Sequence, residues 1–231
     1  VMSGVIKPAA VILRINSKLN ITDTDGREFL SLPVALDSLA WSVMPVFEPA
    51  DAATVEPLVS YLKEIRFTDC FFLSKDAALV KAAREALPAV RGIIDYTEVY
   101  KGKTGLTQEE CIELRKSMKR NNGTVALLPQ SAARQETVQY LYDSIVNVWV
   151  CAADQPDGAG LLDAGQRLDA LFSGALGIVS DDTAGLYAAA TALPMMDSPK
   201  TAFIMSGKSV RTSKFIFQVL QAEKRISRPP H

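Results

Sequence analysis

Short runs of Val, Ile, Leu and Phe recur along the chain, and each is followed by a stretch with apolar residues every three or four positions. Such runs are typical of strands buried on both faces, and such stretches are typical of amphipathic helices. Strands are predicted at residues 10–16, 43–48, 69–74, 90–95, 124–128, 147–151 and 176–180. Helices are predicted at residues 32–40, 52–65, 77–87, 107–121, 135–144, 158–173 and 183–193.

Capping signals agree with these helix boundaries. Asp51 and Thr107 stand at two helix starts, where their side chains can accept hydrogen bonds from unpaired amide groups. Pro88 and Gly123 follow two helix ends, where they act as stop signals. Regular alternation of strands and helices implies parallel pairing through right-handed crossovers, in either a closed barrel or an open doubly wound sheet. Periodicity alone does not separate these two architectures.

The pattern changes after Leu193, where Pro194 and Pro199 bracket a turn-rich break. One further strand, at 201–205, and one further helix, at 213–226, are expected beyond it. Residues 228–231 have the composition of a linker. We therefore expect a barrel core at 1–193 and a C-terminal extension at 194–231, followed by a downstream domain in the full-length protein.

Composition narrows the class of protein. A chain of 231 residues with 48% hydrophobic and 22% charged residues is typical of a globular protein with a full core. Its 25 basic and 26 acidic side chains leave no electrostatic footprint for nucleic acid. Three distant cysteines predict no disulfide framework, and no apolar run is long enough for a membrane span. We expect a soluble domain of a bacterial-type protein, cytoplasmic or exported.

Several strand ends resemble those of glycerophosphodiester phosphodiesterases, over roughly residues 32–190. The segment Gly174-Ala-Leu-Gly-Ile-Val-Ser-Asp181 is similar to the family's Gly-Val-Asp-Gly-Ile-Ile-Thr-Asp, which ends the last barrel strand. The strand with Trp149 resembles the one before it, and Pro45-Val-Phe-Glu48 resembles a strand ending in a glutamate metal ligand. The resemblance implies a parallel (β/α) barrel of the TIM type. Because residues 13–16 match the family's second strand, the N-terminal strand is expected to be irregular or incomplete.

The resemblance fails at the residues that hydrolysis requires. The family implies a His-Arg pair after the first strand, a Glu-x-Asp pair on the second, a second histidine soon after, and a lysine beyond the third-strand glutamate. Here the second strand reads Leu13-Arg14-Ile15-Asn16, and the only histidine is His231 at the end of the sequence. Hydrolysis of this kind needs an imidazole that transfers protons and a cation that holds the phosphoryl oxygens.

Three functions therefore remain open. The first is a catalytically degenerate barrel, a pseudoenzyme that acts as an accessory or binding domain for a small phosphodiester or polyol and needs no cofactor. The second is an active phosphoric diester hydrolase that acts on glycerophosphodiesters in lipid metabolism. It would hold Mg²⁺ or Ca²⁺ with a non-standard acidic set of Glu48, Asp95 and Asp181. The third is a ligand-binding module with an open sheet.

The candidate pocket residues lie near strand ends, because side chains converge at that edge of a barrel. Glu48 is read either as a metal ligand or as a carboxylate paired with Arg14. Trp149 either stacks on a sugar or glycerol unit or lies in the core. Asp181 either binds a ligand or caps the next helix. The full set is Arg14, Asn16, Glu48, Ser74, Lys75, Asp95, Trp149 and Asp181.

Two loops are also candidate sites. Ser74 and Lys75 offer a hydroxyl and an ammonium group that suit a phosphate. The polar loop after Asp95, with Tyr100, Lys101 and Lys103, is either a binding loop or an insertion. The segment from Asp23 to Gly26 is interpreted as a turn, because a calcium loop starting there lacks part of its ligand set.

Overall fold

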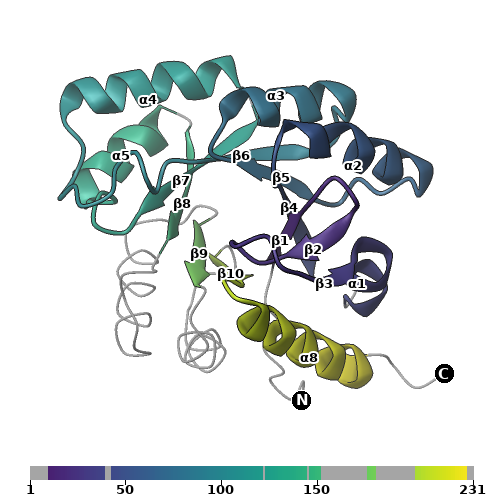
Figure 1. Cartoon of the computed structure of the whole chain (residues 1–231). Helices are drawn as coiled ribbons and strands as arrows, with labels where there is room; N and C mark the ends of the chain where they lie inside the picture. Colours follow the sequence, from purple (N-terminus) through teal and green to yellow (C-terminus); the bar gives the residue numbers. More distant parts are fainter. Residues whose placement is uncertain are drawn as a thin grey trace.

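The fold is a closed parallel barrel. The computed structural model describes residues 10–39, 43–121, 123–144, 146–151, 176–180 and 201–227. Within them ten strands form one sheet, and eight of these run parallel around a ring once the hairpin β2–β3 is set aside (Figure 1). The ring strands are β1 (Ala10–Ile15), β4 (Met44–Pro49), β5 (Phe71–Ser74), β6 (Arg91–Asp95), β7 (Thr124–Pro129), β8 (Asn147–Cys151), β9 (Leu176–Ser180) and β10 (Thr201–Ser206).

Pairing between the first and last strands closes the ring. β10 pairs in parallel with β9 on one side and with Ala10, Val11 and Ile12 of β1 on the other. The predicted parallel barrel is therefore confirmed, and the open-sheet alternative is wrong. The N-terminal strand was expected to be irregular or incomplete, and the ring is complete there, because β10 occupies the position between β9 and β1. The sequence resemblance matches residues 13–16, which overlap β1, to the family's second strand. On that match, β10 occupies the place of the family's first strand.

The N-terminal strand is irregular in its pairing, as expected. The second half of β1 pairs antiparallel with β2 (Asn20–Thr22), which continues into β3 (Glu28–Ser31). This hairpin was not predicted, because its strands are short and polar. Its turn contains Asp25-Gly26, and Gly26 has a φ of 84°, which favours glycine. The interpretation of residues 23–26 as a turn is thus confirmed.

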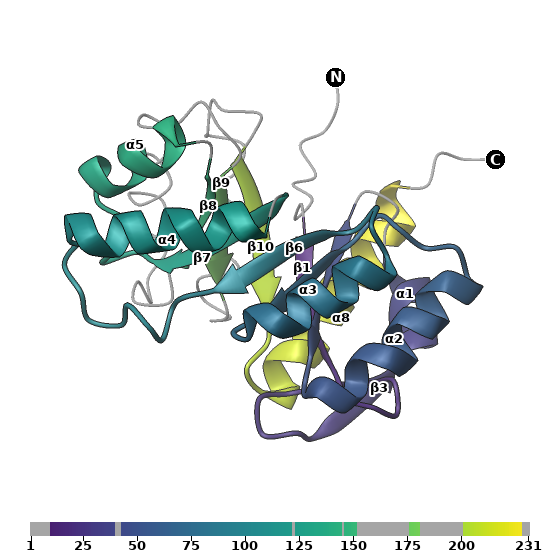
Figure 2. The same ribbon diagram turned by 90° about the horizontal axis from the view of Figure 1, so that it is seen from above.

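Helices cover the outside of the ring (Figure 2). They begin and end within three residues of the predicted bounds. Asp51 accepts a hydrogen bond from the Thr54 amide at 3.0 Å, and Thr107 forms a reciprocal capping box with Glu110. The described helices are α1 (Leu32–Ser38), α2 (Ala52–Glu64), α3 (Ala77–Ala86), α4 (Gln108–Arg120), α5 (Gln135–Asp143) and α8 (Val210–Ser227). The helices predicted at 158–173 and 183–193 lie outside the described residues.

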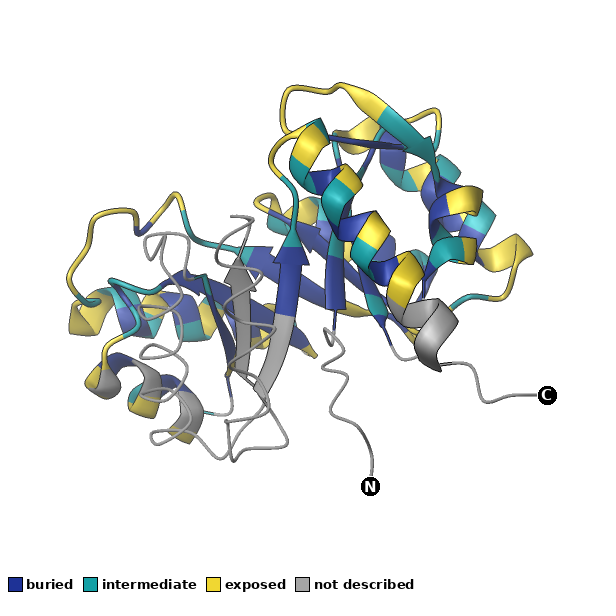
Figure 3. Cartoon of the chain, turned by 90° about the horizontal axis from the view of Figure 1, so that it is seen from below, coloured by how far each residue is buried: buried dark blue, intermediate teal, exposed yellow. Residues whose placement is uncertain are grey.

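Alternate residues of each strand face two separate cores, because successive side chains point to opposite sides of a sheet. One set fills the barrel interior and includes Ala10, Val46, Phe71, Leu73, Ile93, Leu127, Trp149 and Ile204. The other set packs against the helices and includes Leu13, Phe47, Phe72, Ile94, Leu128 and Val150. Where burial is described, the ring strands are accordingly buried on both faces, whereas the helices carry exposed residues on their outer side (Figure 3).

The elements beyond residue 200 pack on the rest of the barrel. Phe217 of α8 contacts Phe29 of β3 with ring centroids 5.8 Å apart, and α8 also packs against α1. The expected boundary between core and extension, at residues 193 and 194, lies outside the described residues. No helix in the described part of the chain is long and apolar enough to cross a membrane.

Candidate functional site

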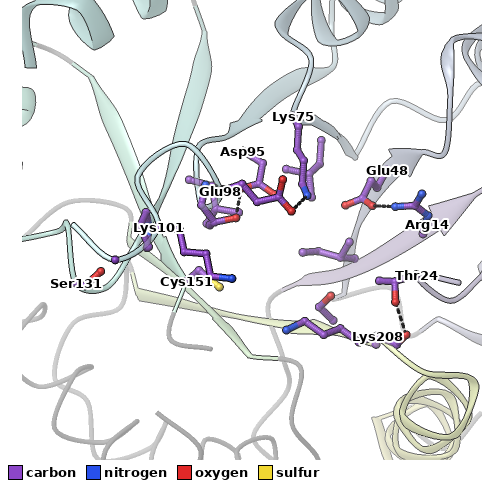
Figure 4. Close-up of a pocket in the computed structure, with 18 residues that line it drawn as sticks. Arg14, Thr24, Glu48, Lys75, Asp95, Glu98, Lys101, Ser131, Cys151 and Lys208 are labelled. Carbon is purple, nitrogen blue, oxygen red and sulfur yellow. Dashed lines mark hydrogen bonds and ion pairs between the residues drawn. The ribbon is translucent and has the colours of Figure 1, made fainter. Parts of the chain in front are cut away.

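A cavity of about 630 Å³ opens at the C-terminal ends of the ring strands (Figure 4). Its inner wall, as far as the structure describes it, consists of the last inward-facing residue of each ring strand other than β9, or of the residue just after it. Its rim consists of the β2–β3 turn and of the loops that follow β5, β6, β7 and β10. The inner residues are Arg14, Glu48, Lys75, Asp95, Pro129, Cys151 and Ser206. This is the edge at which barrels of this type carry their ligands.

A predicted residue reaches the cavity only if its side chain faces the barrel interior and lies near the C-terminal end of its strand. Arg14, Glu48, Lys75 and Asp95 line it. Ser74 points to the opposite side of β5, where it is 8% exposed and accepts a hydrogen bond from the Asp76 amide.

Of the three remaining predicted residues, two do not line the cavity and one lies outside the described residues. Trp149 faces inward but lies one layer below Cys151, against Phe71 at 5.0 Å. The Asn16 side chain is turned into the hairpin, where it donates to Glu28 at 2.7 Å. Asp181 lies outside the described residues.

Arg14 and Glu48 form an ion pair across β1 and β4. They are direct partners in the strand register, and Nη1 of Arg14 lies 2.8 Å from Oε1 of Glu48. The two side chains are 32% and 25% exposed. Burial raises the pKa of Glu48 above its usual range, nearby Arg14 opposes this change, and Asp95 adds to it. The buried Nε of Arg14 has no hydrogen-bond partner among the described residues.

The other two described carboxylates that line the cavity also face donors of the chain. Glu98 lies 2.5 Å from Nζ of Lys75, and this ion pair lowers the pKa of Glu98. Asp95 accepts hydrogen bonds from the Thr97 amide at 2.8 Å and from the Thr97 hydroxyl at 2.6 Å. Asp95 thereby holds the start of the loop that leads to α4.

The loop after β6 is attached firmly to the barrel and extends over one side of the cavity. Tyr100 is 7% exposed and stacks on Tyr96 with ring centroids 5.8 Å apart. Burial raises the pKa of Tyr100 to about 12, so its side chain stays neutral. Lys103 pairs with Glu110 at 2.6 Å. These contacts place Lys101 and Gly102 at the cavity.

The sequence interpretation missed the residues after β10. Ser206, Gly207 and Lys208 line the cavity, and the amide and hydroxyl of Thr24 donate to the Lys208 carbonyl at 3.2 and 2.9 Å. A signal was present, since Ser-Gly-Lys-Ser stands between a predicted strand and a predicted helix. Phosphate sites of these barrels often lie at such a position.

The described carboxylates do not fit a divalent cation. Mg²⁺ and Ca²⁺ require several oxygen ligands directed at one point. In the part of the chain that the structure describes, no three His, Cys, Asp or Glu side chains gather in that way. Glu48 and Glu98 are instead each turned to a basic side chain, and Asp95 is turned to Thr97.

Comparison with known proteins agrees with this architecture. The chain is similar to a glycerophosphoryl diester phosphodiesterase from Parabacteroides distasonis, with a TM-score of 0.56 and 12% sequence identity over 84% of this chain and 80% of that one. The predicted resemblance is therefore confirmed in the fold.

Two other solved structures are also similar. One is a provisionally assigned glycerophosphodiester phosphodiesterase from Galdieria sulphuraria, with a TM-score of 0.46 and 10% identity over 86% of this chain and 68% of that one. The other is Rv1207 of Mycobacterium tuberculosis, with a TM-score of 0.48 and 15% identity over 96% of this chain and 95% of that one. No protein-family model and no curated protein matches the chain.

Proposed function

We propose that this chain is a catalytically degenerate relative of the glycerophosphodiester phosphodiesterases, which binds a small phosphodiester or polyol phosphate at the barrel mouth without cleaving it. In a longer protein it would act as an accessory or binding domain. The observation that carries this proposal is the Arg14–Glu48 ion pair. The glutamate that the resemblance assigns to a metal is in contact with a guanidinium group.

The chemistry of the cavity supports binding rather than hydrolysis. A proton-transfer mechanism needs a group that titrates near neutral pH within reach of the ester oxygens. The sequence has a single histidine, at position 231, and none of the described residues that line the cavity is a histidine. Four basic side chains instead line the cavity, whose size suits a small molecule: Arg14, Lys75, Lys101 and Lys208. Charged hydrogen bonds from such groups are well suited to phosphate oxygens.

The proposal is tested by assaying hydrolysis. The purified protein, incubated with Mg²⁺ or Ca²⁺ and with glycerophosphocholine or bis(p-nitrophenyl) phosphate, is expected to release product no faster than buffer does. Calorimetry under the same conditions is expected to detect binding of glycerophosphocholine. A hydrolytic activity that Glu48→Ala abolishes would overturn the proposal in favour of an active metal-dependent hydrolase of glycerophosphodiesters. Glu113→Ala is the matched control, because Glu113 is 70% exposed on α4 and does not line the cavity.

Ligand affinity is expected to rise as pH falls. Because burial raises the pKa of Glu48, its carboxylate takes up a proton at a higher pH than an ordinary glutamate does. Protonation removes one negative charge from a cavity wall that Glu48 shares with Arg14, Asp95 and Lys75. As the pH falls through the raised pKa of Glu48, the affinity for glycerophosphoglycerol, a phosphodiester with a single negative charge, should increase roughly threefold to tenfold. The phosphodiester keeps a constant charge over this range, so calorimetry reports the change in the protein.

Glu48→Gln provides the control for this pH dependence. The variant carries a neutral side chain of the same shape at every pH, so its affinity should already be high at neutral pH and should change little on acidification. If wild type and Glu48→Gln show the same slope of affinity against pH, Glu48 is not the titrating group.

A further inference from the structure

We infer that the hydroxyl groups of the ligand bind at the Arg14–Glu48 ion pair, and that this pair selects a polyol. The inference rests on the proposed binding function and names the chemical groups that one part of the cavity recognises. Both residues line the cavity. The resemblance assigns Glu48 to a metal ion, whereas here Glu48 and its arginine partner bind neutral groups.

Strand register fixes the place of the pair in the cavity wall. Arg14 of β1 is the direct partner of Glu48 in β4 on one side and of Thr22 in β2 on the other. Direct partners have their side chains on the same face of a sheet, about 5 Å apart. The contact of 2.8 Å between Nη1 of Arg14 and Oε1 of Glu48 then holds the guanidinium group against the carboxylate. A ligand therefore meets a donor and an acceptor that are already in position.

Both side chains keep hydrogen-bonding capacity that the chain does not use. The ion pair joins Nη1 to Oε1, and no described residue forms a hydrogen bond with Nη2 of Arg14 or with Oε2 of Glu48. Nε of Arg14 also lacks a partner, but it is buried, whereas Nη2 and Oε2 are accessible. The pair thus offers the cavity one charged donor next to one charged acceptor.

Hydroxyl groups fit this arrangement better than charged groups do. A phosphate bound to the guanidinium group would lie next to a carboxylate of the same sign, and an ammonium group bound to the carboxylate would lie next to the guanidinium group. A hydroxyl group both donates and accepts, so two adjacent hydroxyls can donate to Oε2 and accept from Nη2 without adding charge. Lys75, Lys101 and Lys208 also line the cavity, so the phosphate group does not depend on Arg14.

The surroundings of the pair also suit a polyol. Thr24 lines the cavity on the same side as Arg14 and Glu48 (Figure 4). Its hydroxyl donates to the Lys208 carbonyl at 2.9 Å, so its oxygen can still accept a hydrogen bond from a ligand. The cavity has apolar lining as well, which can contact a carbon chain: Ile12, Leu73 and Leu127. Apolar lining with a few placed polar groups is typical of sites for small molecules.

Calorimetry with sn-glycerol 3-phosphate and n-propyl phosphate tests the inference. The two ligands have the same phosphate group and the same number of carbon atoms, but n-propyl phosphate has no hydroxyl groups. Wild type is expected to bind sn-glycerol 3-phosphate about tenfold more tightly than n-propyl phosphate, because only the former makes hydrogen bonds to the charged pair. The ratio of the two affinities cancels the effect of the charge that both ligands share.

The variant Arg14→Met/Glu48→Met removes both charges together. The net charge of the cavity is then unchanged, and neither charge is left without its partner. The affinity ratio is expected to fall from about tenfold to about one, while the affinity for n-propyl phosphate stays close to that of wild type. Glu48→Gln keeps the shape of the glutamate and provides a second test if the double variant does not fold. Its ratio should fall to about threefold, because an amide accepts more weakly than a carboxylate.

Glu113→Ala/Lys116→Ala is the matched control. It removes an ion pair of the same charges from the exposed face of α4, where the two side chains are 70% and 61% exposed and do not line the cavity. The affinity ratio of this variant should equal that of wild type. Circular dichroism of each variant distinguishes a lost contact from a lost fold.

The outcomes separate the hydroxyl site from the proposed function. Equal affinity of wild type for the two ligands, or a wild-type ratio in the folded Arg14→Met/Glu48→Met protein, would show that the hydroxyl site is wrong. An equal loss of both ligands in that variant would also contradict it, since the pair would then serve the phosphate group. Binding without cleavage would still stand in each of these cases. If wild type binds neither ligand, the proposed function and the hydroxyl site are both wrong.

Discussion

Trp149→Ala is expected to lower the free energy of unfolding by about 3–5 kcal/mol, the cost typical of removing a large buried aromatic side chain. Trp149 is 7% exposed and lies in the interior of the barrel among inward-facing residues of neighbouring strands. Its ring packs on Phe71, which also contacts the Arg91 guanidinium at 4.5 Å. Truncation would leave a cavity that the closed ring cannot fill by collapse. Urea denaturation followed by circular dichroism measures the loss.

Trp149→Phe is the matched variant for this experiment. It keeps an aromatic ring against Phe71 and should lose less than half as much stability as Trp149→Ala. Both proteins, at temperatures where they are folded, should bind sn-glycerol 3-phosphate with the wild-type affinity, because Trp149 does not line the cavity. A large loss of affinity in Trp149→Ala with little loss of stability would instead identify Trp149 as a stacking surface for the ligand.

Gly207→Ala is expected to destabilise the protein by about 1–3 kcal/mol, the range found for overpacking a tight site. The new Cβ would overlap the Ser213 hydroxyl and lie 3.0 Å from the backbone nitrogen and Cα of Ser213. Since Ser213 is 6% exposed in the first turns of α8, it has little room to move. The loop with Lys208 should shift, and phosphate affinity should fall together with stability.

A double-mutant cycle isolates this steric contact. Ser213→Ala removes the hydroxyl that the new methyl group would meet, so the Gly207→Ala/Ser213→Ala protein should lose less stability than the two single losses predict together. Full additivity in denaturation experiments would show that the two residues do not clash. Gly102→Ala is a useful control for the loop after β6: its φ of 75° strains an alanine, but a Cβ there meets no neighbour within 4 Å.

Strands and helices were predictable because each has a strong local signal. The strand predicted at 176–180 has the same bounds in the structure, and helix starts at Asp51 and Thr107 follow from capping groups next to apolar periodicity. The hairpin β2–β3 was missed because segments of three and four residues are too short to establish a period. Its one clear signal was the Asp25-Gly26 turn.

Part of the site was also predictable. Each of the four predicted residues that line the cavity lies within one residue of a strand end: Arg14, Glu48, Lys75 and Asp95. Side chains at the strand ends of a parallel barrel converge on one mouth. Ser74 and Trp149 were placed there as well, but one faces the helices and the other lies a layer deeper. Lys208 was overlooked because its strand was assigned to an extension instead of to the ring.

The sequence by itself determined the order of the ring strands and of the described helices, the parallel character of the ring and the scarcity of histidine. These properties depend on local periodicity, capping and composition. Only the tertiary structure decided that β10 closes the ring, that Glu48 faces Arg14, and that the loops after β6, β7 and β10 line one cavity. Those contacts join residues far apart in the chain, and their geometry depends on strand register, which a single sequence does not specify.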